Sequence, residues 1–368
     1  MHKGQIKWLA LGVVGMLAFA GCVAQEGDEG TGSDVGGADV ALDPVTGEVS
    51  VKLAIDKTTV TSSERVVVRV TLKNESDHPV RLLSWYAPNG EMEENVFTVT
   101  RGADEVEFIG PHYKRPAPVA DDFVVLGAGM SVTRELDLSD FYDFAKEADY
   151  NVRYNVSFLR DGARDSVTLS SNDVGLWIGA RKSAIQEKPS AGEPLNVTAN
   201  VTYTKCTTAQ AATISDGLNA AGTMVNNAAA YLGGSGSGTP RFTTWFGSYS
   251  STNWNTAKNH YAIIKDAIDN KALNFDCGCK KTYYAYVYPN QPYNVYLCKA
   301  FWTAPLTGTD SKGGTIIHEM SHFNATAATD DWVYGQSGAK SLAISDPLKA
   351  LDNADSHEYF AENTPAQN

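Results

Sequence analysis

Short apolar runs separated by polar or glycine-containing turns dominate the chain from about residue 48 to residue 180. These runs are rich in β-branched and aromatic residues, the composition of strands rather than helices. The predicted strands are Glu64–Leu72, Asn95–Val99, Phe123–Leu126, Ser131–Leu136 and Tyr150–Phe158. Several short strands at this spacing predict an antiparallel β-sandwich of immunoglobulin-like type over residues 48–180. This region contains no recognisable catalytic constellation.

The hydrophobic pattern changes after Cys206 to one typical of helices. Ala209–Leu232 carries apolar residues at a helical spacing, and Thr256–Leu273 is a second helical candidate. Two further strands are predicted at Tyr283–Val287 and Asn294–Leu297. Residues 181–201 contain prolines and charges without a periodic hydrophobic pattern, and they are the predicted linker and processing region. Residues 202–368 are predicted to form a second, mainly helical α+β domain.

The N-terminus has the features of an export signal. Two lysines precede the apolar stretch Trp8–Phe19, which is too short to span a bilayer. We predict a signal peptide over residues 1–21. The run LAFAGC resembles a bacterial lipoprotein signal, in which Cys22 would be lipidated; the alternative is an ordinary secretory signal. Residues 22–47 are rich in glycine and acidic residues, as expected of a solvated tether.

The charge balance excludes one class of partner. The formal net charge is -13, with 30 basic and 43 acidic residues. No basic excess is available to meet phosphates, so we expect no nucleic-acid partner.

Four cysteines remain after Cys22, namely Cys206, Cys277, Cys279 and Cys298. An even number in an exported chain predicts two disulfides, for which three pairings are open. A bond between Cys277 and Cys279, which are separated by a single residue, is not expected.

The stretch GGTIIHEMSHF contains an H-E-x-x-H motif. On a helix, His318 and His322 lie four residues apart on one face and can bind one metal ion. Glu319 can then act as the general base that takes a proton from a water molecule. The alternative is a buried helix whose histidines bond to the backbone.

Catalytic zinc usually takes three protein ligands, so the motif leaves one ligand unidentified. A third histidine at the spacing H-E-x-x-H-x-x-G-x-x-H is excluded, because Ala325 and Ala328 occupy the two added positions. A glutamate from a later helix, Glu358 or Glu362, is one alternative. An aspartate, Asp330 or Asp331, is the other.

The sequence TDDWVYG at Thr329–Gly335 resembles the T-x-D-x-x-Y-G signature of the aspzincins, a family of zinc metallopeptidases. Further segments resemble the peptidyl-Lys metalloendopeptidases of that family: Thr239–Gly247, Tyr286–Asn290, Ala300–Trp302 and Asn353–Asn363. The resemblance covers about residues 202–368 and implies a zincin-type fold. It departs from the family at Ala328, where glycine is usual.

The resemblance implies one catalytic Zn²⁺ bound by His318, His322 and Asp331. It implies that Tyr334 donates its hydroxyl to the oxyanion formed at the scissile carbonyl. It also implies the disulfides Cys206–Cys277 and Cys279–Cys298.

Asp355 and Glu358 are three residues apart, so on a helix they share a face. Paired carboxylates suit a lysine ammonium, and the resemblance implies that these two line the pocket for the residue after the cut bond. We therefore expect substrates cleaved on the amino side of lysine. Without the resemblance, the two acids would be a solvated helix face. His357 is expected to be structural rather than a ligand.

The β-sandwich is then predicted to be a pro-domain that acts as inhibitor or chaperone. Its basic loop HYKRPAP looks exposed, and Lys114 or Arg115 in it is a candidate substrate mimic for the acidic pocket. Processing is expected between about residues 181 and 205, with cuts before Lys182 or Lys205 compatible with self-processing. We expect a monomer, made as an exported and membrane-tethered precursor and then secreted.

A second function class remains open from the sequence. The chain would then be a non-catalytic surface lipoprotein, with an immunoglobulin-like binding module and a degenerate peptidase domain.

Overall fold

The computed structural model describes residues 41–87, 90, 92–160, 166–183 and 201–368. The predicted signal peptide, the lipidation site Cys22, most of the tether and residues 184–200 of the linker lie outside the described residues. Within the described ranges, no helix combines the length and the apolar character needed to cross a bilayer.

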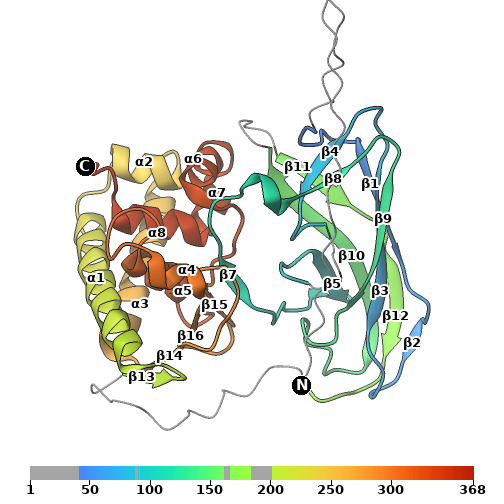
Figure 1. The fold of residues 1–368 in the computed structure, drawn as a ribbon, viewed down its shortest axis with the longest axis horizontal. Helices are drawn as coiled ribbons and strands as arrows, with labels where there is room; N and C mark the ends of the chain where they lie inside the picture. Colours follow the sequence, from blue (N-terminus) through green and yellow to red (C-terminus); the bar gives the residue numbers. More distant parts are fainter. Residues whose placement is uncertain (1–40, 88–89, 91, 161–165, 184–200) are drawn as a thin grey trace, which may run out of the picture. The chain divides into compact units, whose positions relative to one another are not determined.

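Residues 41–183 form a β-rich region (Figure 1). Among the described residues, one sheet has the order β1-β3-β9, a second has the order β2-β12-β10-β5-β6 with β11 beside β10, and β4 pairs with β8. The strands are β1 (Val49–Ala54), β2 (Thr59–Val60), β3 (Val67–Asn74), β4 (Val80–Leu83), β5 (Phe97–Arg101), β6 (Asp104–Glu105), β8 (Phe123–Leu126), β9 (Ser131–Asp137), β10 (Ala148–Leu159), β11 (Ser166–Ser170) and β12 (Val174–Ile178).

Alternation along the strands explains the core of this region. In β3, Val68, Val70 and Leu72 are fully buried, while Val67 is 41% exposed on the other face. Each of the five predicted strands is present, with end points that differ from the predicted ones by at most three residues. The β-rich prediction is confirmed, and the assignment to the immunoglobulin-like class stays a prediction.

Residues 201–368 form a mainly helical region built around a small sheet, which confirms the α+β prediction. Its strands are β13 (Val201–Thr204), β14 (Leu273–Asp276), β15 (Ala285–Val287) and β16 (Asn294–Leu297). Its helices are α1 (Thr208–Leu232), α2 (Pro240–Phe246), α3 (Ser251–Asn270), α4 (Lys299–Thr303), α5 (Lys312–His322), α6 (Gly335–Ser345), α7 (Pro347–Leu351) and α8 (Ala354–Glu362).

Local sequence explains where the helices begin and end. Thr207 caps α1 by accepting a hydrogen bond from the backbone of Gln210, whose side chain returns to the Thr207 backbone. The second predicted helix was wrong at its end, because the chain leaves α3 after Asn270 and Leu273 begins a buried strand. Two of the four positions from Leu273 to Asp276 are polar or charged, and the segment directly follows a helix, which obscures that strand.

One strand of the helical region's sheet comes from the β-rich part of the sequence. Strand β7 (His112–Lys114) pairs antiparallel with β15, completing the order β13-β14-β16-β15-β7. Lys114 lies opposite Ala285 and Tyr113 opposite Tyr286. The two basic residues of the loop that was expected to be exposed are therefore buried, since the side chains of Lys114 and Arg115 are 0% and 2% exposed. Pro116 and Ala117 of the same loop are exposed.

The disulfides are Cys206–Cys277 and Cys279–Cys298, the pairing that the family resemblance implies. The first joins the start of α1 to the end of β14 across 71 residues, and the second joins two segments 19 residues apart.

Loop length predicts which disulfide matters more for stability. Replacing both cysteines of the 71-residue pair by serine should lower the free energy of unfolding by ~4 kcal/mol, and removing the 19-residue pair should lower it by ~3 kcal/mol. Denaturant unfolding followed by circular dichroism, on protein inactivated by Glu319→Gln, measures both values. A larger loss for the shorter loop would contradict the loop-entropy origin.

Candidate metal centre and acidic pocket

Helix α5 carries the H-E-x-x-H motif through the centre of the helical region, and all of its residues are buried. Ser311 is the N-cap and accepts a hydrogen bond from the backbone of Gly314. Gly313 and Gly314 allow close packing on both sides. A Cβ on Gly313 would lie 3.1 Å from the backbone nitrogen of Ala221 in α1, and one on Gly314 would lie 2.9 Å from Oε1 of Glu358 in α8. The glycines before the motif are therefore needed for packing.

Three candidate ligands converge beside α5. His318 Nε2 lies 3.1 Å from His322 Nε2 and 3.2 Å from Asp331 Oδ1, and His322 Nε2 lies 3.4 Å from Asp331 Oδ2. A tetrahedral ion with bonds of ~2.0–2.1 Å has ligand atoms about 3.3–3.4 Å apart, so these spacings fit zinc. Neither oxygen of the buried Asp331 carboxylate accepts a hydrogen bond. An acceptor pair of this kind needs a cation, and the donor set N, N, O is one that zinc prefers.

The segment after α5 turns sharply to bring Asp331 to the histidines. Ala328 has φ 50°, in the left-handed region that glycine adopts most easily, which gives a physical reason for the usual glycine at this position. The turn is held by hydrogen bonds from Thr329 N–H to the Ser321 carbonyl (3.2 Å) and from His322 Nδ1 to the Thr329 carbonyl (2.7 Å). The second bond fixes the His322 tautomer so that Nε2 faces the other ligands.

The two adjacent aspartates have different environments. Asp331 is 2% exposed, whereas Asp330 is 44% exposed and lies 3.5 Å from His112 of β7. The backbone N–H of Asp330 donates to the Asp352 carbonyl at 2.7 Å, which ties the turn to the segment between α7 and α8. Burial raises the pKa of Asp331, but His322 and His318 outweigh it and hold the pKa well below its usual range.

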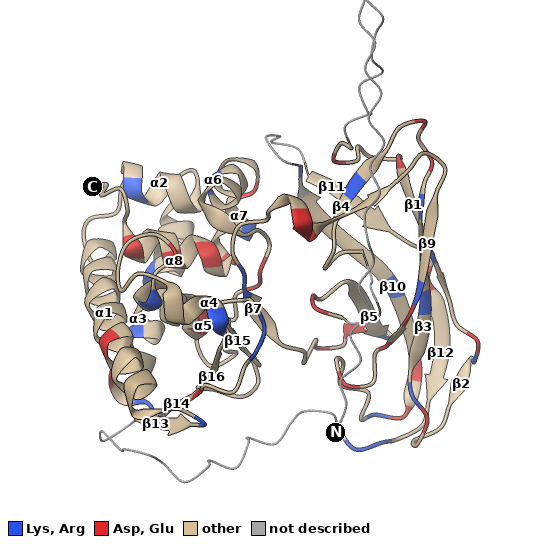
Figure 2. Cartoon of the chain, viewed as in Figure 1, with Lys and Arg blue, Asp and Glu red and all other residues tan. Residues whose placement is uncertain are grey.

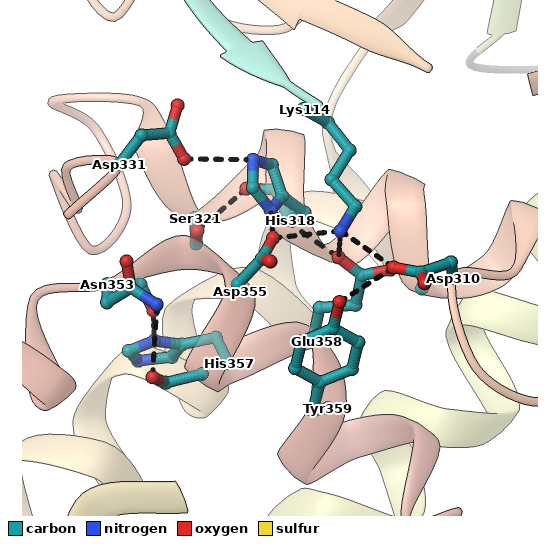
Figure 3. Close-up of polar contacts among 12 residues, drawn as sticks. Lys114, Asp310, His318, Ser321, Asp331, Asn353, Asp355, His357, Glu358 and Tyr359 are labelled. Atoms are coloured by element: carbon teal, nitrogen blue, oxygen red, sulfur yellow. Dashed lines mark hydrogen bonds and ion pairs between the residues drawn. The ribbon is translucent and has the colours of Figure 1, made fainter. Parts of the chain in front are cut away.

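Asp355 connects the candidate metal ligand to the acidic pocket. Its Oδ1 lies 2.9 Å from His318 Nδ1, and its Oδ2 accepts the backbone N–H of Gly335 at 2.6 Å (Figure 3). A carboxylate behind a ligating histidine orients the ring and increases its basicity. Asp355 and Glu358 lie on one face of α8, as predicted.

Lys114 of β7 fills the acidic pocket (Figure 3). Its Nζ lies 2.8 Å from Asp355 Oδ1, 2.8 Å from Glu358 Oε2 and 3.0 Å from Asp310 Oδ1. Burial lowers the pKa of Lys114, but Asp355 and Glu358 outweigh it and raise the pKa well above its ordinary value. Figure 2 shows the same complementarity, with acidic positions on α8 and basic positions along β7. His318, Asp355 and Glu358 could also group around a metal ion, but the ammonium occupies that space.

Glu319 is fully buried between the ligands and β7. Burial raises its pKa well above the usual value, and the neighbouring His318 lowers it by a smaller amount. Within the described residues, neither oxygen of its carboxylate has a hydrogen-bond partner. His112 is also close, since its ring lies 4.9 Å from that of His322.

Tyr334 lies in the core of the β-rich region rather than among the helices. Its hydroxyl donates to Glu94 Oε1 at 2.8 Å, and its ring packs edge-on against Trp85. Burial raises the pKa of Glu94 to about 7. Arg115 lies 3.0 Å from Glu94, so of the two basic candidates in the loop only Lys114 enters the acidic pocket.

The remaining candidates have structural contacts. His357 bonds to His260 (2.9 Å) and to the Asn353 carbonyl (3.1 Å), as expected for a structural histidine. Glu362 accepts hydrogen bonds from the backbone and hydroxyl of Ser311, and therefore supports the start of α5. Glu358 faces His318 Nδ1 at 3.5 Å, on the far side of the ring from Nε2.

Asp310 and Glu94 were not found from the sequence. Asp310 is a single acid in a loop, and Glu94 lies in a region without catalytic pattern, so neither carries a periodic signal. The one sequence feature that points to Asp310 is weak: it directly precedes Ser311, the N-cap of α5.

Comparison with known proteins agrees with this site. Residues 231–362 match the aspzincin family model, described as lysine-specific metallo-endopeptidase. The chain is 46% identical to an extracellular protease of Aeromonas hydrophila over 83% of this chain and 90% of that protein. It is 37% identical to a peptidyl-Lys metalloendopeptidase of Grifola frondosa over 82% of this chain and 88% of that protein.

A third relative matches less than half of this chain. A peptidyl-Lys metalloendopeptidase of Pleurotus ostreatus is 47% identical over 166 residues, which are 45% of this chain and 98% of that protein. The chain belongs to the aspzincin family of metalloendopeptidases, which use zinc. Its alternative interpretation as a non-catalytic lipoprotein is not favoured by these relatives.

The two aspartates allow a matched test of the ligand set. Asp331→Asn should lower zinc affinity by at least ~100-fold, because it removes an anionic ligand from the ion. Asp330→Asn, one residue away and with its side chain directed elsewhere, should leave the zinc content near one ion per chain. Metal analysis after dialysis against a weak chelator distinguishes them, and equal zinc loss in both would contradict the assignment.

Proposed function

We propose that the protein is a zinc-dependent endopeptidase that cuts on the amino side of lysine and is made as a zymogen inhibited by its own β-rich region. The observation that carries this proposal is the position of Lys114. Its ammonium group contacts Asp355 and Glu358, and its backbone belongs to β7, which pairs with β15 at the edge of the sheet. A substrate lysine would need the same pocket, because paired carboxylates suit its compact ammonium group.

The pairing of β7 supports the same interpretation. An extended chain that adds to a free sheet edge gains backbone hydrogen bonds, and a side-chain pocket then selects the sequence. With Lys114 in the pocket, the bond between Tyr113 and Lys114 corresponds to the scissile bond of a substrate. The backbone N–H of Lys114 is then the counterpart of the leaving amine, which Glu319 would protonate.

His318, His322 and Asp331 would hold the zinc ion. When bound, zinc supplies Lewis acidity, which polarises the scissile carbonyl and activates a water molecule. Glu319 takes a proton from the attacking water and transfers it to the leaving amine. The hydroxyl of Tyr334 donates a hydrogen bond to the oxyanion.

The same contacts suggest why the precursor would not cut its own β7. Tyr334 donates its hydroxyl to Glu94 and packs against Trp85, so in this arrangement it is not free to serve the oxyanion. The β-rich region therefore supplies a lysine to the pocket and withdraws a catalytic donor at the same time.

Processing between about residues 181 and 205 would separate the two regions. The Pleurotus relative matches this chain over 166 residues, 98% of its own length, and this is close to the length of the helical region. A relative of that size supports a mature form made of the helical region alone. The extracellular relative supports export. Tethering through Cys22 and a monomeric mature enzyme remain part of the proposal.

Digestion of a denatured protein by the processed enzyme tests the specificity. Most new peptides should begin with lysine, and a zinc chelator should stop the cutting. Glu319→Gln should lower kcat by about 10²–10⁴-fold through loss of the general base, whereas Asp216→Asn on the exposed face of α1 should not. Mass spectrometry of the peptides gives the result, and cuts without preference for lysine would contradict the proposal.

Ligand binding to an inactive precursor tests the inhibitory role of Lys114. In a Glu319→Gln precursor, Lys114→Ala should increase affinity for a lysine-containing peptide at least ~10-fold, because it removes the competing ammonium from a buried ion pair. Fluorescence anisotropy of a labelled peptide measures this. Lys52→Ala, at an exposed lysine of β1, is the matched control, and unchanged affinity in the Lys114 variant would contradict inhibition by this residue.

A further inference from the structure

The acidic pocket has a third carboxylate that lies outside α8. Asp310, in the loop before α5, places Oδ1 3.0 Å from the Nζ atom of Lys114. The other two carboxylates, Asp355 and Glu358, each lie 2.8 Å from the same atom. An ammonium has three N–H donors, so the three oxygens match its full donor set.

Asp310 is held in position by its own contacts. The hydroxyl of Tyr359 donates to the same Oδ1 at 2.7 Å, and the backbone N–H of Asp310 donates to Glu362 Oε2 at 3.2 Å. Its backbone has φ 51°, a left-handed conformation that is uncommon outside glycine. Such conformations persist where surrounding contacts fix them, and they cluster at binding sites.

We propose that Asp310 is a specificity-determining residue that completes a three-carboxylate receptor for a primary ammonium group. The inference rests on the proposed function, because Lys114 stands in for the substrate lysine. The pocket is closed to water at this point: the side chains of Lys114, Asp355 and Glu358 are each 0% exposed, and Asp310 at 26% forms its outer wall.

The number of acceptors distinguishes lysine from other cations. A buried N–H without an acceptor is destabilising, and so is a buried carboxylate without a donor. An ε-monomethyl-lysine keeps its charge but has only two N–H donors, so one of the three carboxylates must face a methyl group. A guanidinium spreads its donors over three nitrogens in a plane and cannot direct three of them from one point. The tyrosine rings at 5.2 and 5.6 Å favour any cation, so they add attraction without this selectivity.

The test compares two substrates on the processed enzyme. Matched peptides carry either lysine or ε-monomethyl-lysine after the cut bond. Asparagine tolerates the left-handed backbone at position 310, so Asp310→Asn should lower kcat/KM for the lysine peptide by ~10-fold. Asp310→Ala should lower the same kcat/KM by up to ~100-fold. The loss for monomethyl-lysine should be no more than ~2-fold, because its methyl group can point toward the altered side chain.

The ratio of the two kcat/KM values is the decisive readout. It should fall in both Asp310 variants, with zinc content unchanged, and stay at the wild-type value in the exposed-surface control Asp216→Asn. An equal loss for both substrates, in an enzyme that still prefers lysine, would show that Asp310 only supports the fold and would overturn the inference alone. A wild-type enzyme without lysine preference would overturn the proposed function as well.

Discussion

The burial of one ammonium group governs the arrangement of the centre of this molecule. Lys114 has no exposed side-chain surface, and a buried charge is tolerated only when it is paired and fully hydrogen-bonded. Its partners come from α8 and from the loop before α5, and one of them, Asp355, also contacts His318. The pocket and the candidate metal centre therefore share an oxygen atom, so a shift in one is transmitted to the other.

This sharing explains the packing around α5. Two acidic side chains of α8 reach toward the helix that carries the candidate metal ligands, and Gly314 leaves the space that a Cβ would fill near Glu362 and Glu358. The N-cap Ser311 is held by Glu362 of the same helix. Consequently α8 contacts both the ring of His318 and the first turn of α5. Gly314 leaves room for the carboxylates opposite it, whereas Gly313 leaves room for α1.

Much of this arrangement was predictable from the sequence, and the limits are physical. The spacing of His318 and His322 predicts one ligand face, and the spacing of Asp355 and Glu358 predicts one acidic face, because helical periodicity is local. The strand alternation in residues 48–180 likewise predicts the β-rich region. Pairing between distant segments has no such local signature, which is why β7 was taken for an exposed loop and Asp310 was missed. The choice of Asp331 over Asp330 came from the family resemblance, and the burial of Asp331 agrees with it.

The two regions hold each other through an exchange of residues. The β-rich region places Lys114 among the helices, and the helical region places Tyr334 in the core of the β-rich region against Trp85 and Glu94. Cutting the linker would remove the covalent connection but neither of these contacts. In the proposed zymogen, release would then require the pocket to exchange one ammonium for another, since three carboxylates left without a cation are destabilising. The proposed substrate lysine would make this exchange.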